Sequence, residues 1–339
     1  MSFGLPYKGS KSAIAKDIIG VLPGGNRLVD LFCGGCAITD YALKNTDKFN
    51  RFLINDIDER NPKTYMKALN GVFRNEDRWI SRQDFFKLKE TDDYVRLCFS
   101  FGNSGKTYMY GPQIEPYKRA IHHIVFWEDY TPMEELCPAV VKIIHDYCDG
   151  KDRKGRRLAL GKAVAAHVKE MGSVEYWQSN PMFRAVKVKW SEDRRGMSSS
   201  QWNRGSSLQS LESLERLQSL QSLQSLESLE HLERLDRMER QNVQIVASAD
   251  DYRNYVYQDG DVVYCDPPYV NTSKYTADFD NEGFWQWCRT RDFPVYVSEY
   301  RAPEDFISIW CKEKRRLFND RGLSTNAVEH LFLHKKWLE

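Results

Sequence analysis

Short apolar runs bounded by turn residues occur near both ends of the chain. Such runs predict buried β-strands. They lie at residues 26–32, 51–56, 261–265, 294–298 and 330–334, and residues 243–246 alternate between apolar and polar side chains. A helix is predicted at 37–43, between the first two strands and directly after a glycine turn. Strand, glycine turn, helix, and a second strand ending in an acid form the βαβ pattern of a nucleotide-binding sheet.

The middle of the chain has a different pattern. Residues 70–206 are helical in pattern and rich in aromatic side chains. The net charge of the chain is only +1, yet residues 151–205 hold 13 lysines and arginines against five acidic residues. A local basic excess of this kind indicates contact with phosphates, although a solvated surface is the simpler alternative.

A leucine repeat follows the helical region. Leucine recurs at every third position from Leu208 to Leu235, and Met238 completes the series. A period of three makes a leucine stripe drift around an α-helix, whereas a 3₁₀ helix would keep it on one face. We expect one long helical rod and favour 3₁₀ slightly over α. The rod would serve as a stiff spacer or packing surface, or be an expanded repeat without a role.

The composition of the chain predicts the cellular compartment of the protein. The chain has 339 residues and is 41% hydrophobic, with no run of 18 apolar residues and no basic start followed by an apolar stretch. We therefore expect a cytoplasmic protein without a membrane segment and with reduced thiols. Cys33 and Cys36 form a CxxC pair, but no second pair accompanies them, so we expect no metal.

The most specific motif is Asp266-Pro267-Pro268-Tyr269, which directly follows a predicted buried strand. Ligands of open α/β sheets bind at the carboxyl ends of strands. A planar amino group is a poor nucleophile, and hydrogen bonds from it to Asp266 and the Pro267 carbonyl would draw it toward a tetrahedral state. Tyr269 offers a flat face for a base removed from a duplex. The motif predicts methylation of a planar amino group.

A second motif starts at the end of the first strand. Gly34 and Gly35 follow Asp30, and glycines there let the backbone approach a ligand closely. The spacing is not that of a dinucleotide fingerprint. An acidic pocket lined by backbone suits the cationic S-adenosylmethionine better than a phosphate. Asp56, after the second strand, is placed to accept hydrogen bonds from ribose hydroxyls.

Together these segments resemble the DNA-adenine methyltransferases of the Dam type, particularly phage and prophage versions of the alpha group. The resemblance rests on five blocks in the family's order: residues 6–11, 30–36, 55–58, 249–252 and 266–269. It implies cofactor contacts from Tyr7, Lys11, Asp30, Phe32, Gly34, Asp56, Asp266 and Asp251, with Asp250 as an alternative to Asp251. The cysteines at positions 33 and 36 depart from the small residues usual there.

The resemblance also implies an architecture. We expect a Rossmann-like α/β methyltransferase sheet formed by residues 1–69 and 242–339, in a bacterial or phage-infected cell. A mostly helical target-recognition domain would occupy 70–206, and the leucine repeat 207–241. Residues 98–108 resemble, more loosely, the family's DNA-contacting loop, which makes Asn103, Lys106 and Tyr108 candidate DNA contacts. Tyr275 is a candidate second wall for the flipped base.

We therefore predict a site-specific DNA-adenine N6-methyltransferase that uses S-adenosylmethionine and acts on double-stranded DNA. We expect a monomer, with association through the leucine repeat as the alternative. Other functions remain open. A methyltransferase acting on adenine in RNA or on a protein glutamine needs the same motif, whereas a DNA-binding relative without activity, or a scaffold built on the leucine rod, would not use it.

Overall fold

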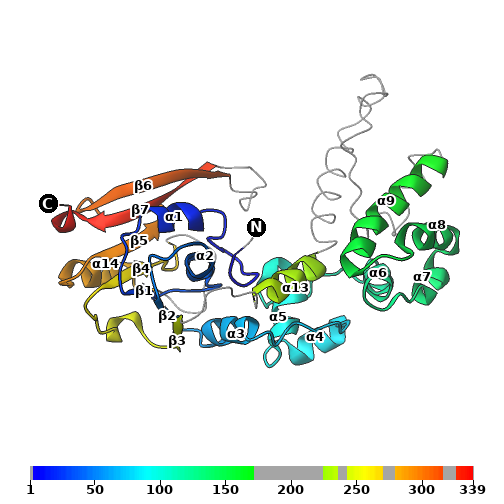
Figure 1. The fold of residues 1–339 in the computed structure, drawn as a ribbon, viewed down its shortest axis with the longest axis horizontal. Helices are drawn as coiled ribbons and strands as arrows, with labels where there is room; N and C mark the ends of the chain where they lie inside the picture. Colours follow the sequence, from blue (N-terminus) through cyan, green and yellow to red (C-terminus); the bar gives the residue numbers. More distant parts are fainter. Residues whose placement is uncertain (1–2, 172–223, 236–242, 270–278, 316–325, 339) are drawn as a thin grey trace, which may run out of the picture. The chain divides into compact units, whose positions relative to one another are not determined.

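The computed structural model describes residues 3–171, 224–235, 243–269, 279–315 and 326–338. The chain forms two compact units (Figure 1). Unit 1 comprises Met1–Arg74 and His231–Glu339, and unit 2 comprises Asn75–Glu230. Two distant parts of the sequence therefore build unit 1, with unit 2 lying between them in the chain.

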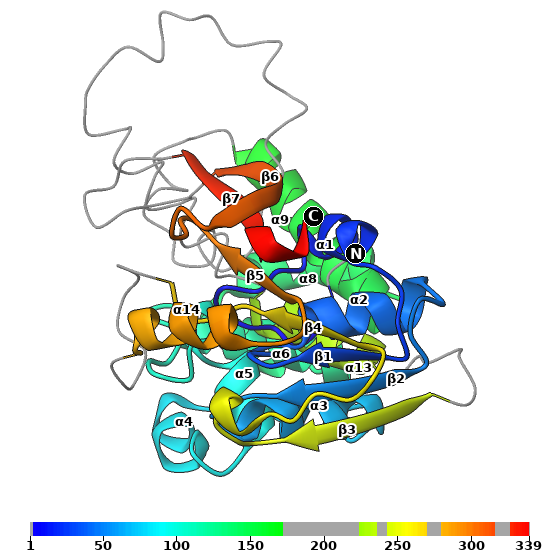
Figure 2. The ribbon, with the colours of Figure 1, turned by 90° about the vertical axis from the view of Figure 1, so that its left-hand side faces the viewer.

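Unit 1 contains a seven-stranded sheet in the order β3-β2-β1-β4-β5-β7-β6. Figure 2 shows the strands one above another in this order, from β3 at the bottom to β6 at the top. The strands are β1 (Arg27–Asp30), β2 (Arg51–Asn55), β3 (Gln244–Ser248), β4 (Asp261–Cys265), β5 (Val295–Glu299), β6 (Phe306–Arg315) and β7 (Asn326–His334). The first five pair in parallel, and β7 is antiparallel to both neighbours.

This mixed α/β architecture is consistent with the predicted Rossmann-like methyltransferase fold. Each predicted apolar run lies in or overlaps a strand, whereas β6 was not predicted. The central strands β1 and β4 are buried along their whole length, because helices cover both faces of a parallel sheet.

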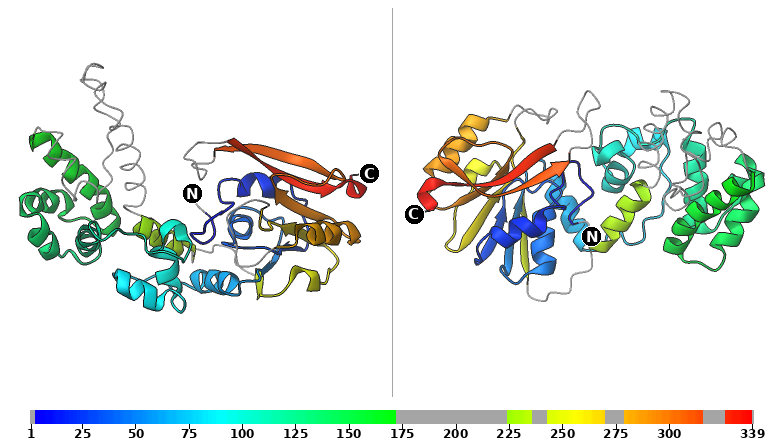
Figure 3. Two further views of the ribbon diagram at one scale, coloured as in Figure 1. Left: turned by 180° about the vertical axis from the view of Figure 1, so that it is seen from behind. Right: turned by 90° about the horizontal axis from the view of Figure 1, so that it is seen from above.

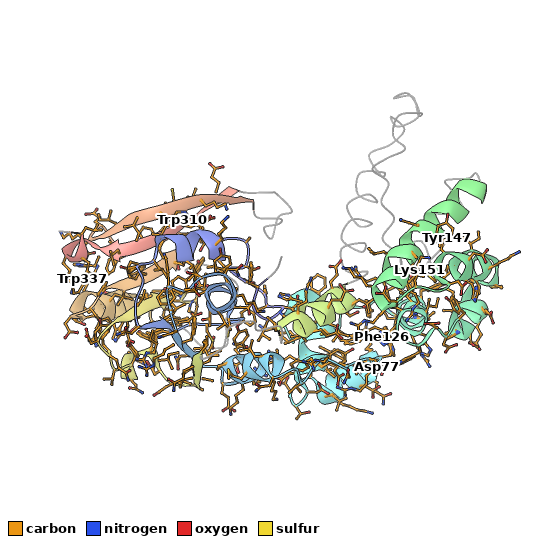
Figure 4. All side chains as sticks on the ribbon, viewed as in Figure 1. Asp77, Phe126, Tyr147, Lys151, Trp310 and Trp337 are labelled. Carbon is orange, nitrogen blue, oxygen red and sulfur yellow. The ribbon has the colours of Figure 1, made fainter. Side chains whose placement is uncertain are left out.

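Alternate residues of these strands point to two different cores. On one face, Leu28 and Val262 pack with residues of α1 (Ala15–Val21) and α2 (Ala37–Asn45). On the other face, Val29 and Val263 pack with Phe284 and neighbouring side chains of α14 (Asn281–Thr290). Trp310 and Trp337, which Figure 4 labels, pack against the first core. The helix α3 (Arg60–Leu69) follows β2.

Unit 2 is helical in the part that the structure describes, as Figure 3 shows from two sides in cyan and green. Its helices are α4 (Arg82–Leu88), α5 (Asp93–Cys98), α6 (Glu115–Trp127), α7 (Thr131–Leu136), α8 (Pro138–Cys148) and α9 (Arg153–Met171), with a 3₁₀ turn at Phe101–Asn103. Ser81 and Asp92 cap α4 and α5 by accepting hydrogen bonds from backbone amides. Phe126, labelled in Figure 4, stacks on His122 at the core of this unit.

The described part of the leucine repeat forms the α-helix α13 (Gln224–Leu235). The slight preference for a 3₁₀ helix is therefore wrong for these residues, and the remainder of the predicted rod lies outside the described residues. Four leucines at a spacing of three sweep about half the circumference of an α-helix. All four, Leu226, Leu229, Leu232 and Leu235, are buried, and so are the neighbouring Ser225 and Ser228. Broad tertiary burial thus removes any need to keep the leucines on one stripe.

Candidate active site

The site lies at the carboxyl ends of the parallel strands in unit 1. Asp30, the last residue of β1, pairs in register with Ile54 of β2 and Tyr264 of β4. Asp56 and Asp266 each follow two residues after these partners. Three carboxylates therefore meet at one edge of the sheet, where ligands of such sheets bind.

A buried lysine neutralises part of this charge. Lys11 Nζ lies 3.0 Å from Asp266 Oδ1 and 3.2 Å from Glu329 Oε1. It also lies 4.2 Å from the centre of the Tyr269 ring, which is within the range of a cation–π contact. The structure thus brings together Lys11, Asp266 and Tyr269 of the predicted site, and it adds Glu329.

The Tyr269 ring is held from two sides. Its hydroxyl donates a hydrogen bond to Glu329 Oε1. The Tyr300 ring lies edge-on to it, with centroids 4.6 Å apart and an interplanar angle of 78°. The Tyr300 amide in turn donates to Glu299 Oε1 at 2.7 Å. The ring therefore has a fixed orientation beside Asp266.

Burial makes the acids of this site hard to ionise. It is the main cause that raises the pKa of Asp266 to about 6, although Lys11 works in the opposite direction. Burial also raises the pKa of Asp30 and of Glu299 to about 7. Burial alone would lower the pKa of Lys11, but Asp266 and Glu329 outweigh it and raise that pKa. The site holds more acid than base, which favours a cationic ligand.

The predicted cofactor loop packs tightly. Gly34 has a φ of 45°, and its amide donates to Asp56 Oδ2 at 2.8 Å. The Tyr7 side chain covers the loop so closely that a Cβ at Gly35 would lie 2.6 Å from the Tyr7 Cβ. A side chain at this glycine would displace the N-terminal segment. The glycines are thus required by the close approach of Tyr7, whatever ligand the loop binds.

The remaining predicted cofactor residues are Phe32 and Asp251, with Asp250 as the alternative to Asp251. Phe32 contacts the rings of Tyr252, Phe279 and Phe284. Asp251 pairs with Arg253 at 2.5 Å, which lowers its pKa. A cavity of about 210 Å³ is lined by Asp250, Asp251 and, among others, Leu31, Leu53, Asn55, Ser248 and Tyr255. Both candidate acids therefore line one cavity beside the ends of β2 and β3.

The predicted DNA contacts have different environments within unit 2. Lys106 is exposed. Asn103 has a φ of 53°, and its side chain donates to the Leu97 carbonyl at 2.7 Å and to Ser228 Oγ at 2.9 Å. Tyr108 is buried, and its hydroxyl donates to the Ile80 carbonyl at 2.8 Å, so its environment does not favour contact with DNA. Tyr275 lies outside the described residues.

Sequence reasoning missed Glu299, Tyr300 and Glu329. Glu299 ends β5, and an acid at the end of a predicted parallel strand was the available signal. Glu329 lies inside β7, where an acid carries no comparable signal. Its partners come from the N-terminus and from the residues after β4, so only the tertiary fold reveals it.

The described residues contain no group of three or more His, Cys, Asp or Glu side chains placed to hold a metal ion. No helix within the described ranges is long and apolar enough to cross a membrane. Cys33 and Cys36 are buried free thiols, and burial, the main cause, raises the pKa of both.

Comparison with known proteins adds an independent finding. Residues 7–121 match the family model described as D12 class N6 adenine-specific DNA methyltransferase. The matched range includes Tyr7, Lys11, Asp30 and Asp56, and it ends before Asp266. No curated protein matches the chain. The match supports an adenine DNA methyltransferase family and thereby a DNA-acting methyltransferase.

Proposed function

We propose that the protein is a site-specific DNA-adenine N6-methyltransferase that uses S-adenosylmethionine and acts on an adenine flipped out of duplex DNA. The observation that supports this most directly is the placement of Asp266 and Tyr269. Both follow β4 at the ligand-binding edge of the sheet, with Lys11 within 3.0 Å of Asp266. The family match to residues 7–121, which begins in the first segment of unit 1 and extends into unit 2, supports the same chemistry.

The residues at this edge fit S-adenosylmethionine. Its sulfonium and amino groups are cationic, and the edge holds the acids Asp30, Asp56 and Asp266. Asp30 Oδ1 is buried without a hydrogen-bond partner among the described residues, which suits an additional donor from a ligand. When bound, the cofactor supplies a methyl group on a sulfonium.

Specific contacts follow from the placement of each side chain. Asp56 would accept from the ribose hydroxyls, and Lys11 would bind the carboxylate. Phe32 would pack against the adenine ring beside the cavity lined by Asp251, while Tyr7 and Gly34 would close the loop.

Asp266 acts as a hydrogen-bond acceptor in this proposal. Because its pKa is about 6, it is largely ionised at neutral pH. Its carboxylate and the Pro267 carbonyl would each accept a hydrogen bond from the target amino group. Pro268 stiffens the turn, Tyr269 stacks on the base, and Tyr275 is the proposed second wall. Positioning and hydrogen bonding supply the catalysis, and no separate base is needed because the methylated nitrogen is strongly acidic.

Unit 2 is the proposed recognition domain. Its exposed Lys106 suits a phosphate contact. Asn103 is anchored by two hydrogen bonds, so it would shape the loop as well as contact DNA. Tyr108 would support this loop from the core, because it pairs with Ser100 in an isolated β-bridge.

The decisive experiment incubates the protein with methyl-labelled cofactor and, separately, duplex DNA, RNA and a glutamine peptide. We expect label in N6-methyladenine of DNA, and a loss of at least about 1000-fold in Asp266→Ala. The exposed Asp292→Ala is the matched control and should keep full activity.

Three other results would contradict or change the proposed function. Activity of Asp266→Ala within about tenfold of the wild type would contradict the proposed catalytic role of Asp266. Label in RNA or peptide alone would move the function to that substrate. Calorimetric binding of the cofactor without any transfer would indicate an inactive relative.

A further inference from the structure

We infer that Glu329 is a positioning residue of this site: it shares Lys11 with Asp266, so that Asp266 can turn its carboxylate to the target amino group. The inference rests on the proposed function. Glu329 comes from β7, which runs antiparallel to its neighbours and lies outside the parallel strand ends that carry the other acids. No motif of the sequence points to it.

One oxygen atom of Glu329 contacts both Lys11 and Tyr269. The residue is fully buried, and its Oε1 atom lies 3.2 Å from Lys11 Nζ and also accepts the hydrogen bond of the Tyr269 hydroxyl. Its Oε2 atom is buried with no partner among the described residues. One carboxylate therefore fixes both the cation and the aromatic ring that flank Asp266.

The position of Lys11 creates a conflict that Glu329 can resolve. The ammonium lies 3.0 Å from Asp266 Oδ1 and 4.2 Å from the centre of the Tyr269 ring. The ammonium therefore contacts both Asp266 and Tyr269, the two groups that a target base needs. A buried ammonium that loses a counter-charge pays a large desolvation penalty. Because Glu329 already contacts Lys11, the ammonium stays paired when Asp266 turns away.

Glu299 provides an instructive contrast. It is also buried and ends the neighbouring strand β5, but its Oε1 atom accepts the Tyr300 amide, and no ion pair joins it to Lys11 among the described residues. Burial of an acid near the site is therefore not sufficient. The direct contacts with Lys11 and Tyr269 distinguish Glu329.

The test uses Glu329→Gln, which removes the charge but keeps a carbonyl oxygen for the Tyr269 hydroxyl. Lys11 then pairs with Asp266 alone. We expect kcat to fall about tenfold or more, while the Kd for S-adenosylmethionine changes less than about threefold. Glu282→Gln, at an exposed position of α14, removes the same charge and should leave both values unchanged.

The pH dependence separates this role from a merely structural one. The charge of Glu329 raises the pKa of Asp266. Its removal should therefore lower that pKa and move the acidic limb of the kcat/KM profile to lower pH. A variant that was only less well folded would lose activity without this shift.

A second readout does not require activity. The Asp266 carboxyl carbon can be titrated by ¹³C NMR, with Asp266→Asn used for assignment. The pKa should fall in Glu329→Gln and stay unchanged in Glu282→Gln. An unchanged or higher pKa, or a kcat within about twofold of the wild type, overturns the inference. If the wild type methylates no adenine but the titration shifts as expected, only the proposed function fails.

Discussion

The two units bury opposite charges. Among the described residues, unit 1 buries five acids (Asp30, Asp40, Asp261, Glu299 and Glu329) and two bases (Lys11 and Arg27). Unit 2 buries three bases (Arg96, Lys118 and Arg156) and, in its described part, no acid. Since a buried charge is costly unless it is compensated, each set must have a reason.

The reasons differ between the units. In unit 2, Arg156 donates to the Val125 carbonyl and pairs with Glu128, so its charge secures helix ends. In unit 1, Asp261 forms an equally internal pair with Arg27 at 2.6 Å. Asp30, Glu299 and Glu329, however, each keep one buried oxygen without a partner among the described residues. Unit 1 thus contains an acidic excess that a ligand can complete, whereas the charge of Arg156 in unit 2 serves the shape of that unit.

The largest expected effect is that of Lys11→Ala. It leaves the Asp266 and Glu329 carboxylates together without their cation, which should lower the free energy of unfolding by about 3 kcal/mol at pH 8. Lys11 lowers the pKa of Asp266, so this pKa should rise in the variant. The loss should shrink at pH 5.5, because a proton can then replace the lysine. Urea unfolding at both pH values measures it.

Lys63→Ala is the matched control for this comparison. Lys63 pairs with Glu59 at 2.6 Å, but both side chains are more than 60% exposed. We expect a loss below about 0.5 kcal/mol with little pH dependence. Equal losses in the two variants would contradict the idea that the acidic excess in unit 1 depends on Lys11.

The second prediction concerns Asp30→Asn. Burial raises the pKa of Asp30 to about 7, so its folded-state pKa lies above that of the unfolded chain. The stability that this group contributes is therefore complete below about pH 4 and is lost as pH rises through 7. Asparagine does not titrate, and its carbonyl can still accept the Thr39 hydroxyl. We expect the stability of the variant relative to the wild type to be higher at pH 8 than at pH 5, by at least about 1 kcal/mol.

The same variant should bind S-adenosylmethionine at least about tenfold more weakly, because it loses a charge that faces a cationic ligand. Calorimetry measures this affinity, and thermal unfolding without the cofactor measures stability. Stability gained with unchanged affinity would mean that Asp30 has only a structural role.

Some features of the two units can be predicted from the sequence, and others cannot. Local signals sufficed for β1 and β4, because strands buried on both faces are continuous apolar runs. They failed for β6, an edge strand that carries Lys312 and Glu313 among its apolar residues. The register then placed Asp30, Asp56 and Asp266 at one edge. Glu329 and the α-helical conformation of α13 depend on long-range packing, which no local pattern encodes.

Ser228→Ala tests the neutral hydrogen bonds that hold unit 2. Ser228 accepts from Asn103 at 2.9 Å and is buried. Its removal takes one hydrogen bond from the Asn103 side chain, which should cost about 1 kcal/mol. Hydrogen exchange of the amides of residues 101–107 should accelerate. Ser104→Ala, at an exposed hydroxyl of the same loop, is the control and should change stability less. No change in Ser228→Ala would mean that the repeat helix does not support this loop.

The smallest effect is expected for Lys106→Ala. This variant tests most directly how the charges of unit 2 differ in role from those of unit 1. If the interior of unit 2 serves shape, then its contribution to DNA binding comes from exposed charges such as Lys106. Loss of one phosphate contact should weaken binding about threefold on every duplex sequence and reduce the slope of log K against log salt by about 1. Fluorescence anisotropy at several salt concentrations measures both quantities, and Lys162→Ala, exposed on α9, tests whether any surface lysine has this effect. A loss confined to one DNA sequence would instead make Lys106 a base contact, because phosphate contacts carry no sequence information.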